Sequence, residues 1–286
     1  MHTLITVIIY GKRPIESLTL NKLLELKYDN YQLLLVNNGP ELIEPNDSFL
    51  ESFSIKKNKV LIINYTDNKA LSFIYNMVLN DYEKYDRFVF FDDDSDIDDG
   101  FFESIDATYN NKVDLQLPLI FDNDNAYYPI IDGVIYSDEK SANEKIGKYN
   151  DLFSIGSGLI IYSNLVKKFQ QRNMKLFDDN FALYGVDYSF FRRIAILKKK
   201  HQEDVNVAIS SKINHSLSRT SNEYSSWRHK ERLLDIVLTQ RYYSKGISIS
   251  TLILFKLILK EALKLRLKNI YLIISTFIIG CHPRCR

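Results

Sequence analysis

Residues 87–94 read Arg-Phe-Val-Phe-Phe-Asp-Asp-Asp, an apolar run that ends directly in three carboxylates. A short run of β-branched and aromatic residues is typical of a strand covered on both faces, as in a parallel sheet. Side chains alternate along an extended chain, so Asp92 and Asp94 face the same side. The stretch therefore predicts a central strand whose carboxyl end presents a pair of carboxylates.

Similar apolar runs recur upstream, separated by helical patterns. They predict strands over residues 4–10, 31–36 and 60–64 and helices over 15–27 and 70–79. Such alternation favours a parallel sheet with helices on both faces, which binds ligands at the carboxyl ends of its strands. Beyond about residue 115 the pattern loosens, with short strands expected over 115–121, 159–162 and 205–209. The polar clusters that follow the early strands are Gly11-Lys12-Arg13, Asn37-Asn38-Gly39 and Thr66-Asp67-Asn68.

Composition excludes several classes of protein. With 286 residues and 45% apolar content, the chain can bury a large core. The 37 basic and 36 acidic residues nearly cancel, which argues against nucleic acid as a partner. The two cysteines, Cys281 and Cys285, lie at the very end, so the body holds no disulfide framework. The first residues show no signal-peptide pattern, so we expect a cytoplasmic protein.

Three adjacent carboxylates repel one another and need compensation from solvent or a cation. Mg²⁺ or Mn²⁺ is the natural compensator, because these ions take carboxylate oxygens together with substrate phosphates. A solvated acidic loop is the plainer alternative. An EF-hand loop is disfavoured, because Ile97 stands where that loop needs glycine and a strand-like run precedes it instead of a helix.

At this point the chain resembles the family 2 glycosyltransferases, and particularly bacterial polysaccharide and rhamnosyltransferase-like members. The resemblance covers roughly residues 3–230. The matching pieces occur in the family's order, and the departures are Asn37 for an aspartate, Ala70 for a glycine and Val186 for a glutamate. These pieces are Val7 to Arg13, Val36-Asn37-Asn38-Gly39, Asn68 through Asn76, Asp92-Asp93-Asp94, Gly156-Ser157-Gly158-Leu159-Ile160, Phe177-Asp178-Asp179, Tyr184-Gly185-Val186-Asp187, Arg192 and His215-Ser216-Leu217-Ser218.

The resemblance implies a GT-A fold, that is, a Rossmann-like mixed sheet flanked by helices, and it assigns roles to residues. Asp187 would be the general base, and Asp92, Asp94 and His215 would hold Mn²⁺ or Mg²⁺. Each assignment has a plainer alternative: Asp187 as a surface carboxylate at a helix start, and His215 as a structural histidine. The residues implied to contact the nucleotide sugar are Tyr10, Gly11, Arg13, Asn37, Asn68, Asp92, Asp93, Gly156, Ser157 and Arg192.

The implied activity is inverting transfer of a sugar from a nucleotide-diphosphate sugar to a glycan or lipid-linked acceptor. The implied pathway is synthesis of a cell-surface polysaccharide such as lipopolysaccharide O-antigen or capsule. A catalytically silent GT-A-like scaffold or sugar-binding subunit is the rival class. A nucleotidyltransferase lacks support, because no glycine-rich phosphate loop follows the first strand. Trp227 and the pair Tyr242-Tyr243 are expected to be packing residues more than sugar platforms.

The last part of the chain differs in composition from the rest. From Lys256 onward it holds seven basic residues against Glu261 alone, interleaved with leucine and isoleucine. We expect a basic amphipathic helix that rests on an anionic membrane surface, with packing on the body of the protein or on a partner subunit as the alternative. The apolar run 270–279 is too short to span a bilayer. The expected domains are residues 1–245, divided into a nucleotide-sugar half (1–115) and an acceptor half (116–245), and a peripheral membrane tail (246–286).

Overall fold

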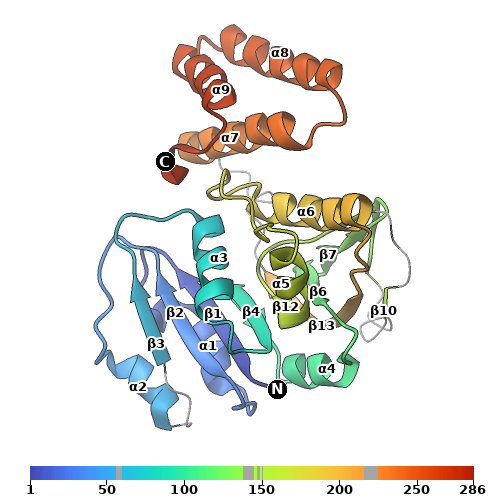
Figure 1. Cartoon of the computed structure of the whole chain (residues 1–286). Helices are drawn as coiled ribbons and strands as arrows, with labels where there is room; N and C mark the ends of the chain where they lie inside the picture. The colour runs from blue at the N-terminus through green and yellow to red at the C-terminus, as the bar shows by residue number, and fades with distance from the viewer. Residues whose placement is uncertain (56–59, 138–144, 147–148, 150, 216–224) are drawn as a thin grey trace.

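The fold is taken from a computed structural model that describes all residues except 56–59, 138–144, 147–148, 150 and 216–224. Its main sheet has the strand order β10-β13-β6-β12-β4-β1-β2-β3 (Figure 1). The strands of the first part are parallel and match the sequence-based expectation closely. They are β1 (Thr3–Ile9), β2 (Gln32–Asn37), β3 (Val60–Asn64) and β4 (Arg87–Asp92).

Strand β1 shows that the main sheet is covered on both of its faces. Alternate residues point to opposite faces, so Leu4 and Ile8 join one apolar cluster while Ile5, Val7 and Ile9 join the other. Helices α3 (Leu71–Asp81), α5 (Ser163–Gln170) and α6 (Val186–His201) cover the first face. Helices α1 (Leu18–Glu25), α2 (Ser48–Ile55) and α4 (Phe101–Thr108) cover the second. Both faces are therefore buried, as a continuous apolar strand requires.

The second part of the chain makes the sheet mixed. Strand β12 (Leu159–Tyr162) runs antiparallel to both β4 and β6 (Leu115–Asp122), while β13 (Val207–His215) runs parallel to β6. The short strand β5 (Ser95–Ile97) pairs with the end of β13. The remaining elements are η1 (Pro14–Glu16), β7 (Asn125–Tyr128), β8 (Ile130–Ile131), β9 (Val134–Ile135), β10 (Lys145–Ile146), β11 (Leu152–Phe153) and η3 (Pro283–Cys285).

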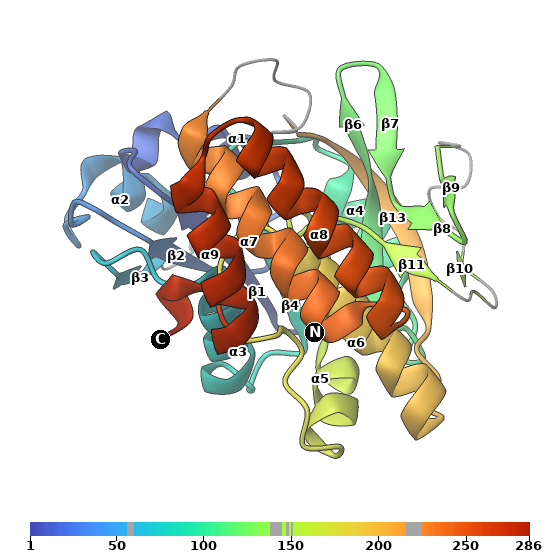
Figure 2. The ribbon, with the colours of Figure 1, turned by 90° about the horizontal axis from the view of Figure 1, so that it is seen from above.

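Helices α7 (Ser226–Tyr243), α8 (Ile247–Leu263) and α9 (Leu267–Ile279) form a separate layer beyond α3 and α6 (Figures 1 and 2). Leu233 and Val237 of α7 pack against Ile273 of α9, with apolar residues of α8 around them. We expected one basic helix through Lys256 and Lys268, but the chain breaks after Leu263. Leu265 adopts φ +54°, a left-handed conformation that ends the helical hydrogen-bond pattern.

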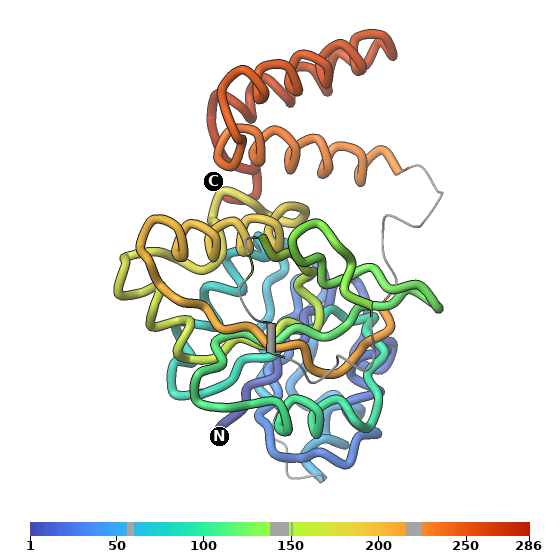
Figure 3. Tube along the Cα trace, turned by 90° about the vertical axis from the view of Figure 1, so that its right-hand side faces the viewer, coloured from blue at the N-terminus to red at the C-terminus, as the bar shows by residue number. Residues whose placement is uncertain are grey.

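Polar contacts fix this three-helix layer to the core. The Tyr243 hydroxyl donates to Asp178 at 2.5 Å. Arg284, near the C-terminus, donates to Asn68 at 2.8 Å and to Glu231 at 2.9 Å. The last residues of the chain therefore return to the edge of the sheet where β3 ends, as the position of the C-terminus in Figures 1 and 3 shows.

Candidate active site

The three aspartates lie in one large cavity at the carboxyl ends of β1 and β4. The cavity has a volume of about 990 Å³ and is lined on the core side by Tyr10, Asn38, Asn68, Tyr75, Asp92, Asp93, Asp94, Gly156, Asp187 and His215. On the opposite side it is lined by α7. All ten of these core residues come from segments that resemble family 2 motifs, and the fold brings them together from seven separate parts of the chain.

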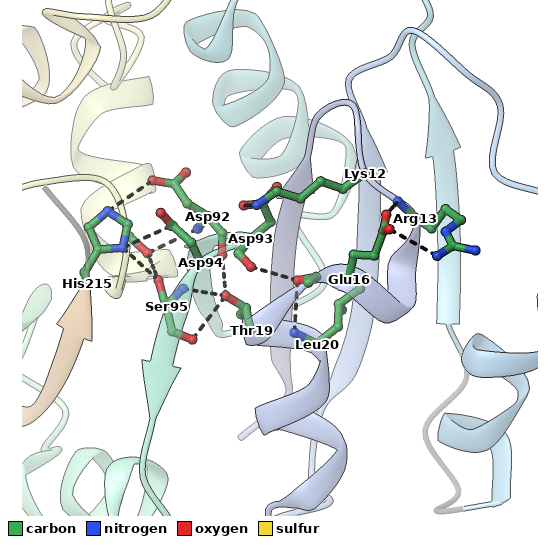
Figure 4. Close-up of polar contacts among 12 residues, drawn as sticks. Lys12, Arg13, Glu16, Thr19, Leu20, Asp92, Asp93, Asp94, Ser95 and His215 are labelled. Carbon is green, nitrogen blue, oxygen red and sulfur yellow. Dashed lines mark hydrogen bonds and ion pairs between the residues drawn. The ribbon is translucent and has the colours of Figure 1, made fainter. Parts of the chain in front are cut away.

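Asp92, Asp94 and His215 converge within this cavity. Their ligand atoms all lie within 4.8 Å of one another. His215 Nε2 is 3.9 Å from an Asp92 carboxylate oxygen, and His215 Nδ1 is 3.3 Å from one of Asp94 (Figure 4). Two carboxylates and an imidazole form a donor set that suits Mn²⁺ or Mg²⁺ with phosphate oxygens completing the shell. These residues therefore fit a divalent cation.

Sheet pairing explains how His215 reaches the aspartates. In the antiparallel pair β13–β5, His215 lies opposite Ser95, the residue that follows Asp94. The register of β13 shifts between Ile209 and Lys212, where Ser211 has φ +66°. Such a bulge re-aims the strand that follows it. His215 thus arrives beside the acidic loop although it lies 120 residues away from Ser95 in the chain.

Side chains from neighbouring elements hold the loop of the three aspartates through hydrogen bonds and an ion pair. The Thr19 hydroxyl donates to the Asp92 carbonyl at 2.6 Å and accepts from the Ser95 amide at 2.8 Å. The Asp92 amide donates to Ser157 at 3.1 Å. Lys12 pairs with Asp93 at 2.7 Å (Figure 4). Asp93 therefore already has a cation, whereas Asp92 and Asp94 face the histidine.

The electrostatics of the cluster favour a bound cation. Burial raises the pKa of Asp92 to about 6, opposed by His215 and reinforced by the charges of Asp94 and Asp93. A raised pKa means that the ionised form is destabilised. A divalent cation would remove this destabilisation. A bound cation would therefore stabilise this partly buried cluster more than it would stabilise a solvated acidic loop.

Asp187 occupies the first turn of α6, beside the acidic cluster. Burial raises its pKa to about 7, with the charge of Asp92 adding to the shift and a hydrogen bond from the Gly156 backbone opposing it. A Cβ on Gly156 would lie 2.8 Å from Asp187 Oδ1 and 2.9 Å from the Tyr75 hydroxyl oxygen. Glycine at this position therefore leaves the space that the carboxylate fills.

Two asparagines line the cavity beyond the ends of β2 and β3. The Asn38 amide group donates to Asn68 at 3.3 Å and to the Lys69 carbonyl at 3.0 Å. Within the described residues its carbonyl oxygen has no hydrogen-bond partner. In the motif Val36-Asn37-Asn38-Gly39, the sequence predicted a donor contact for Asn37 only. The position of Asn38 beside Asn68 makes Asn38 a candidate ligand-contacting residue as well.

Five of the residues expected to contact the donor lie outside the cavity lining. Asn37 is turned toward the loop that follows it and donates to the Glu41 carbonyl at 2.6 Å and to Asn64 at 2.7 Å. Arg13 pairs with Glu16 at 3.1 Å, and Gly11 donates to the Gly39 carbonyl at 2.8 Å. Ser157 is buried beneath Asp92, where it supports the loop.

Arg192 is the fifth of these residues. It pairs with Asp151 and lies over the Tyr188 ring at 4.9 Å from its centre. In this conformation the roles of all five are to shape the loops around the cavity, and direct contact with a donor stays a prediction. Residues 216–218 of the His-Ser-Leu-Ser motif lie outside the described residues.

The sequence predicted no functional role for the residues on the opposite wall of the cavity. Tyr184, Trp227, Arg228, Arg232, Asp235, Thr239, Gln240 and Arg284 line the cavity from the segment before α6, from α7 and from the C-terminus. Trp227, expected to be a packing residue, keeps 53% of its surface exposed. Helical periodicity gave no signal for these residues, because a helix shows the same pattern whether its inner face meets a core or a cavity.

Comparison with solved structures identifies the fold. One similar structure is residues 1–349 of S. aureus TarS in complex with UDP-GlcNAc, at 13% identity and TM-score 0.53, covering 100% of this chain and 83% of that one. A second is the mannosyltransferase PcManGT from Pyrobaculum calidifontis in complex with GDP-Man and Mn²⁺ (14%, 0.52, 99% and 76%). A third is GalNAc-T7 with UDP, GalNAc and Mn²⁺ (9%, 0.55, 85% and 52%).

The chain spans only 41% of a longer TarS structure that it also matches. No family model matches the sequence, and no curated protein matches it. At such low identities the likeness establishes the architecture, and the architecture is GT-A, as the sequence motifs predict.

Proposed function

We propose that this protein is a metal-dependent glycosyltransferase that uses a nucleotide-diphosphate sugar. One observation carries the proposal: Asp92, Asp94 and His215 converge in the same cavity as Asp187, at the carboxyl edge of a GT-A sheet. The similar structures named above are complexes with UDP-GlcNAc, GDP-Man or UDP, and two of the three also hold Mn²⁺. A scaffold with no catalytic role would have no need for a partly buried carboxylate of raised pKa beside that cluster.

The chemistry follows from the side chains that line the cavity. A divalent cation held by Asp92, Asp94 and His215 would neutralise charge on the leaving diphosphate. Asp187 accepts the proton of the acceptor hydroxyl. As the acceptor oxygen bonds to the anomeric carbon, the bond to the diphosphate oxygen breaks and that oxygen keeps the electron pair. A single displacement inverts the anomeric centre, and it requires no covalent nucleophile.

The activity test is release of nucleoside diphosphate from a panel of nucleotide sugars with and without Mn²⁺. Asp187→Asn should lower turnover about 100-fold or more while nucleotide binding persists, because a general base contributes at least this factor. Asp94→Ala should abolish the response to Mn²⁺. The matched control is Asp99→Asn, which changes an exposed carboxylate outside the cavity lining. Full turnover in Asp187→Asn would refute the assignment of the base.

We further propose that the enzyme works at the inner face of a membrane in cell-surface polysaccharide synthesis of the O-antigen or capsule type. Helices α8 and α9 lie beyond α7, on the far side from the sheet (Figures 1 and 3). These helices and the turn between them contain Ile247, Leu263, Leu265 and Tyr271, whose side chains are 75% exposed or more. Exposed lysines lie among these residues at positions 256, 260, 264 and 268. Apolar side chains with interspersed lysines suit an anionic lipid surface.

Among the described residues, no helix combines the length and the apolar character needed to cross a bilayer. Attachment would therefore be peripheral. Flotation with vesicles containing anionic lipid should carry the protein upward, and vesicles of neutral lipid should carry less. Lys256→Glu with Lys260→Glu should reduce flotation, whereas Lys112→Glu on the distant core should not. Equal behaviour of the two variants would contradict attachment through this face.

A further inference from the structure

The cavity extends well beyond the residues that would hold the metal and the donor. Its volume of about 990 Å³ lies at the upper end of the range for single-ligand pockets, about 300–1,000 Å³. The metal cluster and the two asparagines occupy the core side. The other side is formed by α7 and by Tyr184, which we call the α7 wall. There is thus room for a second ligand between Asp187 and α7.

The α7 wall is aromatic and cationic. Arg228 and Arg232 line it one helical turn apart, together with the half-exposed Trp227. The guanidinium of Arg232 lies 5.6 Å from the centre of the Tyr184 ring. A planar guanidinium matches the geometry of phosphate oxygens and is the side chain most often used to bind them. Aromatic rings offer large rigid surfaces for a sugar ring.

Asp235 is the only acid among the described residues that line this wall, and it lies against the start of α6. Asp235 accepts a hydrogen bond from Thr239 at 3.1 Å. A Cβ on Gly185 would lie 2.2 Å from an Asp235 carboxylate oxygen, so this glycine allows α7 to approach the turn that carries Asp187. This contact places α7, which carries Arg228 and Arg232, beside the turn that carries Asp187. A ligand held on the α7 wall would therefore lie in the same cavity as Asp187 and close to the turn that carries it.

We propose that the α7 wall is the acceptor subsite, and that the acceptor carries a phosphate or diphosphate group next to the sugar that receives the transfer. The inference rests on the proposed glycosyltransferase function. The guanidinium groups of Arg228 and Arg232 bind the phosphate, and Trp227 packs on the sugar.

Trp227 makes the proposal directly measurable, because it is the only tryptophan in the chain. Its fluorescence should respond to ligands on the α7 wall. The probes are glucose 1-phosphate, methyl glucoside as its neutral counterpart, and farnesyl diphosphate-linked glucose. Titrations use the full-length Asp94→Ala variant without metal, so that phosphate binding through the metal site does not contribute.

Both phosphorylated probes should change the fluorescence, and methyl glucoside should bind at least tenfold more weakly. Arg228→Ala and Arg232→Ala should each weaken the phosphorylated probes about tenfold, since hydrogen bonds to charged groups contribute this much. Lys230→Ala removes an exposed cation of the same helix that lies outside the cavity, and it should have no effect. A preference for the farnesyl probe identifies a lipid carrier, and equal binding identifies a phosphate within a soluble or polymeric acceptor.

Two failures can be told apart. If phosphorylated and neutral probes bind equally, or if the arginine variants behave like Lys230→Ala while the wild-type protein still binds Mn²⁺ and nucleotide, the acceptor subsite is refuted alone. If Mn²⁺ and nucleotide do not bind but arginine-dependent fluorescence changes persist, the proposed transferase function is refuted and the α7 wall is an anion site of another kind. In an active enzyme, the arginine variants should raise the KM of the acceptor and leave that of the donor unchanged.

Discussion

Replacing Gly156 by alanine tests whether the position of Asp187 controls catalysis. The new Cβ would lie 2.8 Å from Asp187 Oδ1 and 2.9 Å from the Tyr75 hydroxyl oxygen, whereas ordinary contacts of this kind lie at 3.4–4 Å. One of the two groups must therefore retreat by about half an ångström, because protein interiors are close-packed. Gly156 has no positive φ, so the backbone itself accepts alanine.

Tyr75 is the less able to move. Its ring is 2% exposed and lies 4.9 Å from the ring centre of Phe90 and 4.6 Å from that of Phe177. Asp187 faces the open cavity, so its carboxylate should take up the displacement. A shift of 1 Å in a reacting group costs about 100-fold in rate, so half of that distance should cost about tenfold.

The assay compares kcat, donor KM and Tm for Gly156→Ala and for Gly246→Ala. Gly246 has φ 171° and nothing within 4 Å of an added Cβ, so its replacement should leave all three values unchanged. We expect Gly156→Ala to lower kcat about tenfold with donor KM preserved, and overpacking to cost about 1–3 kcal/mol of stability. If kcat in Gly156→Ala matches that of Gly246→Ala, the carboxylate is not positioned in the way that the structure implies.

Three further predictions concern charge. Because Asp187 must be ionised to act as a base and burial raises its pKa to about 7, kcat/KM should rise with pH through the neutral range. Asp235→Asn removes a neighbouring negative charge that raises this pKa, so the rise should move to lower pH in a measured pH profile; an unmoved profile would argue against Asp187 as the titrating group. The raised pKa values of Asp92, Asp187 and Asp235 mean that the folded protein binds more protons than the unfolded chain, so without metal these groups should lower Tm as pH rises from about 4 to 7. Mn²⁺ should therefore raise Tm in differential scanning calorimetry more at pH 8 than at pH 5, and Asp94→Ala should lose this increment. Glu261 is fully buried between Asn269 at 2.6 Å and His229 at 3.0 Å, so Glu261→Ala should destabilise the layer of α7, α8 and α9 by about 3–5 kcal/mol, seen as faster hydrogen exchange there than in the sheet.

The first part of the fold was predictable because its signals are local. A strand such as β1, buried on both faces, must be apolar at every position, and a turn such as Asn37-Asn38-Gly39 carries the residues that turns require. The acidic cluster was predictable for the same reason, since a strand end followed by carboxylates is visible within eight residues. In these places the sequence-based bounds differ from those of the four strands β1 to β4 by at most one residue.

Other features depend on contacts between distant segments. The approach of His215 to Asp94 requires the pairing of β5 with β13 and the bulge near Ser211. The break at Leu265 has no glycine or proline to mark it, and a leucine in the left-handed conformation, which costs about 1–2 kcal/mol, is not expected from local sequence. The cavity side of α7 could not be told from a packing side, because α7 is both: Leu233 and Val237 face α9 while Arg228 and Arg232 face the cavity.

The position of α7 links the two proposals about membrane and acceptor. One side of α7 packs on α9, whose outer residues Tyr271 and Ile278 are 75% and 69% exposed, and another side lines the cavity. Packed helix axes lie about 8–10 Å apart, so a bilayer in contact with α8 and α9 would lie about two helix layers from the phosphate on the α7 wall. That distance suits a sugar joined to its lipid through a diphosphate, because the carrier can stay in the bilayer while the sugar reaches Asp187. Loss of lipid attachment with retained phosphate recognition would instead place the acceptor phosphate in a polymer, and the exposed apolar residues of α8 and α9 would then require a protein partner.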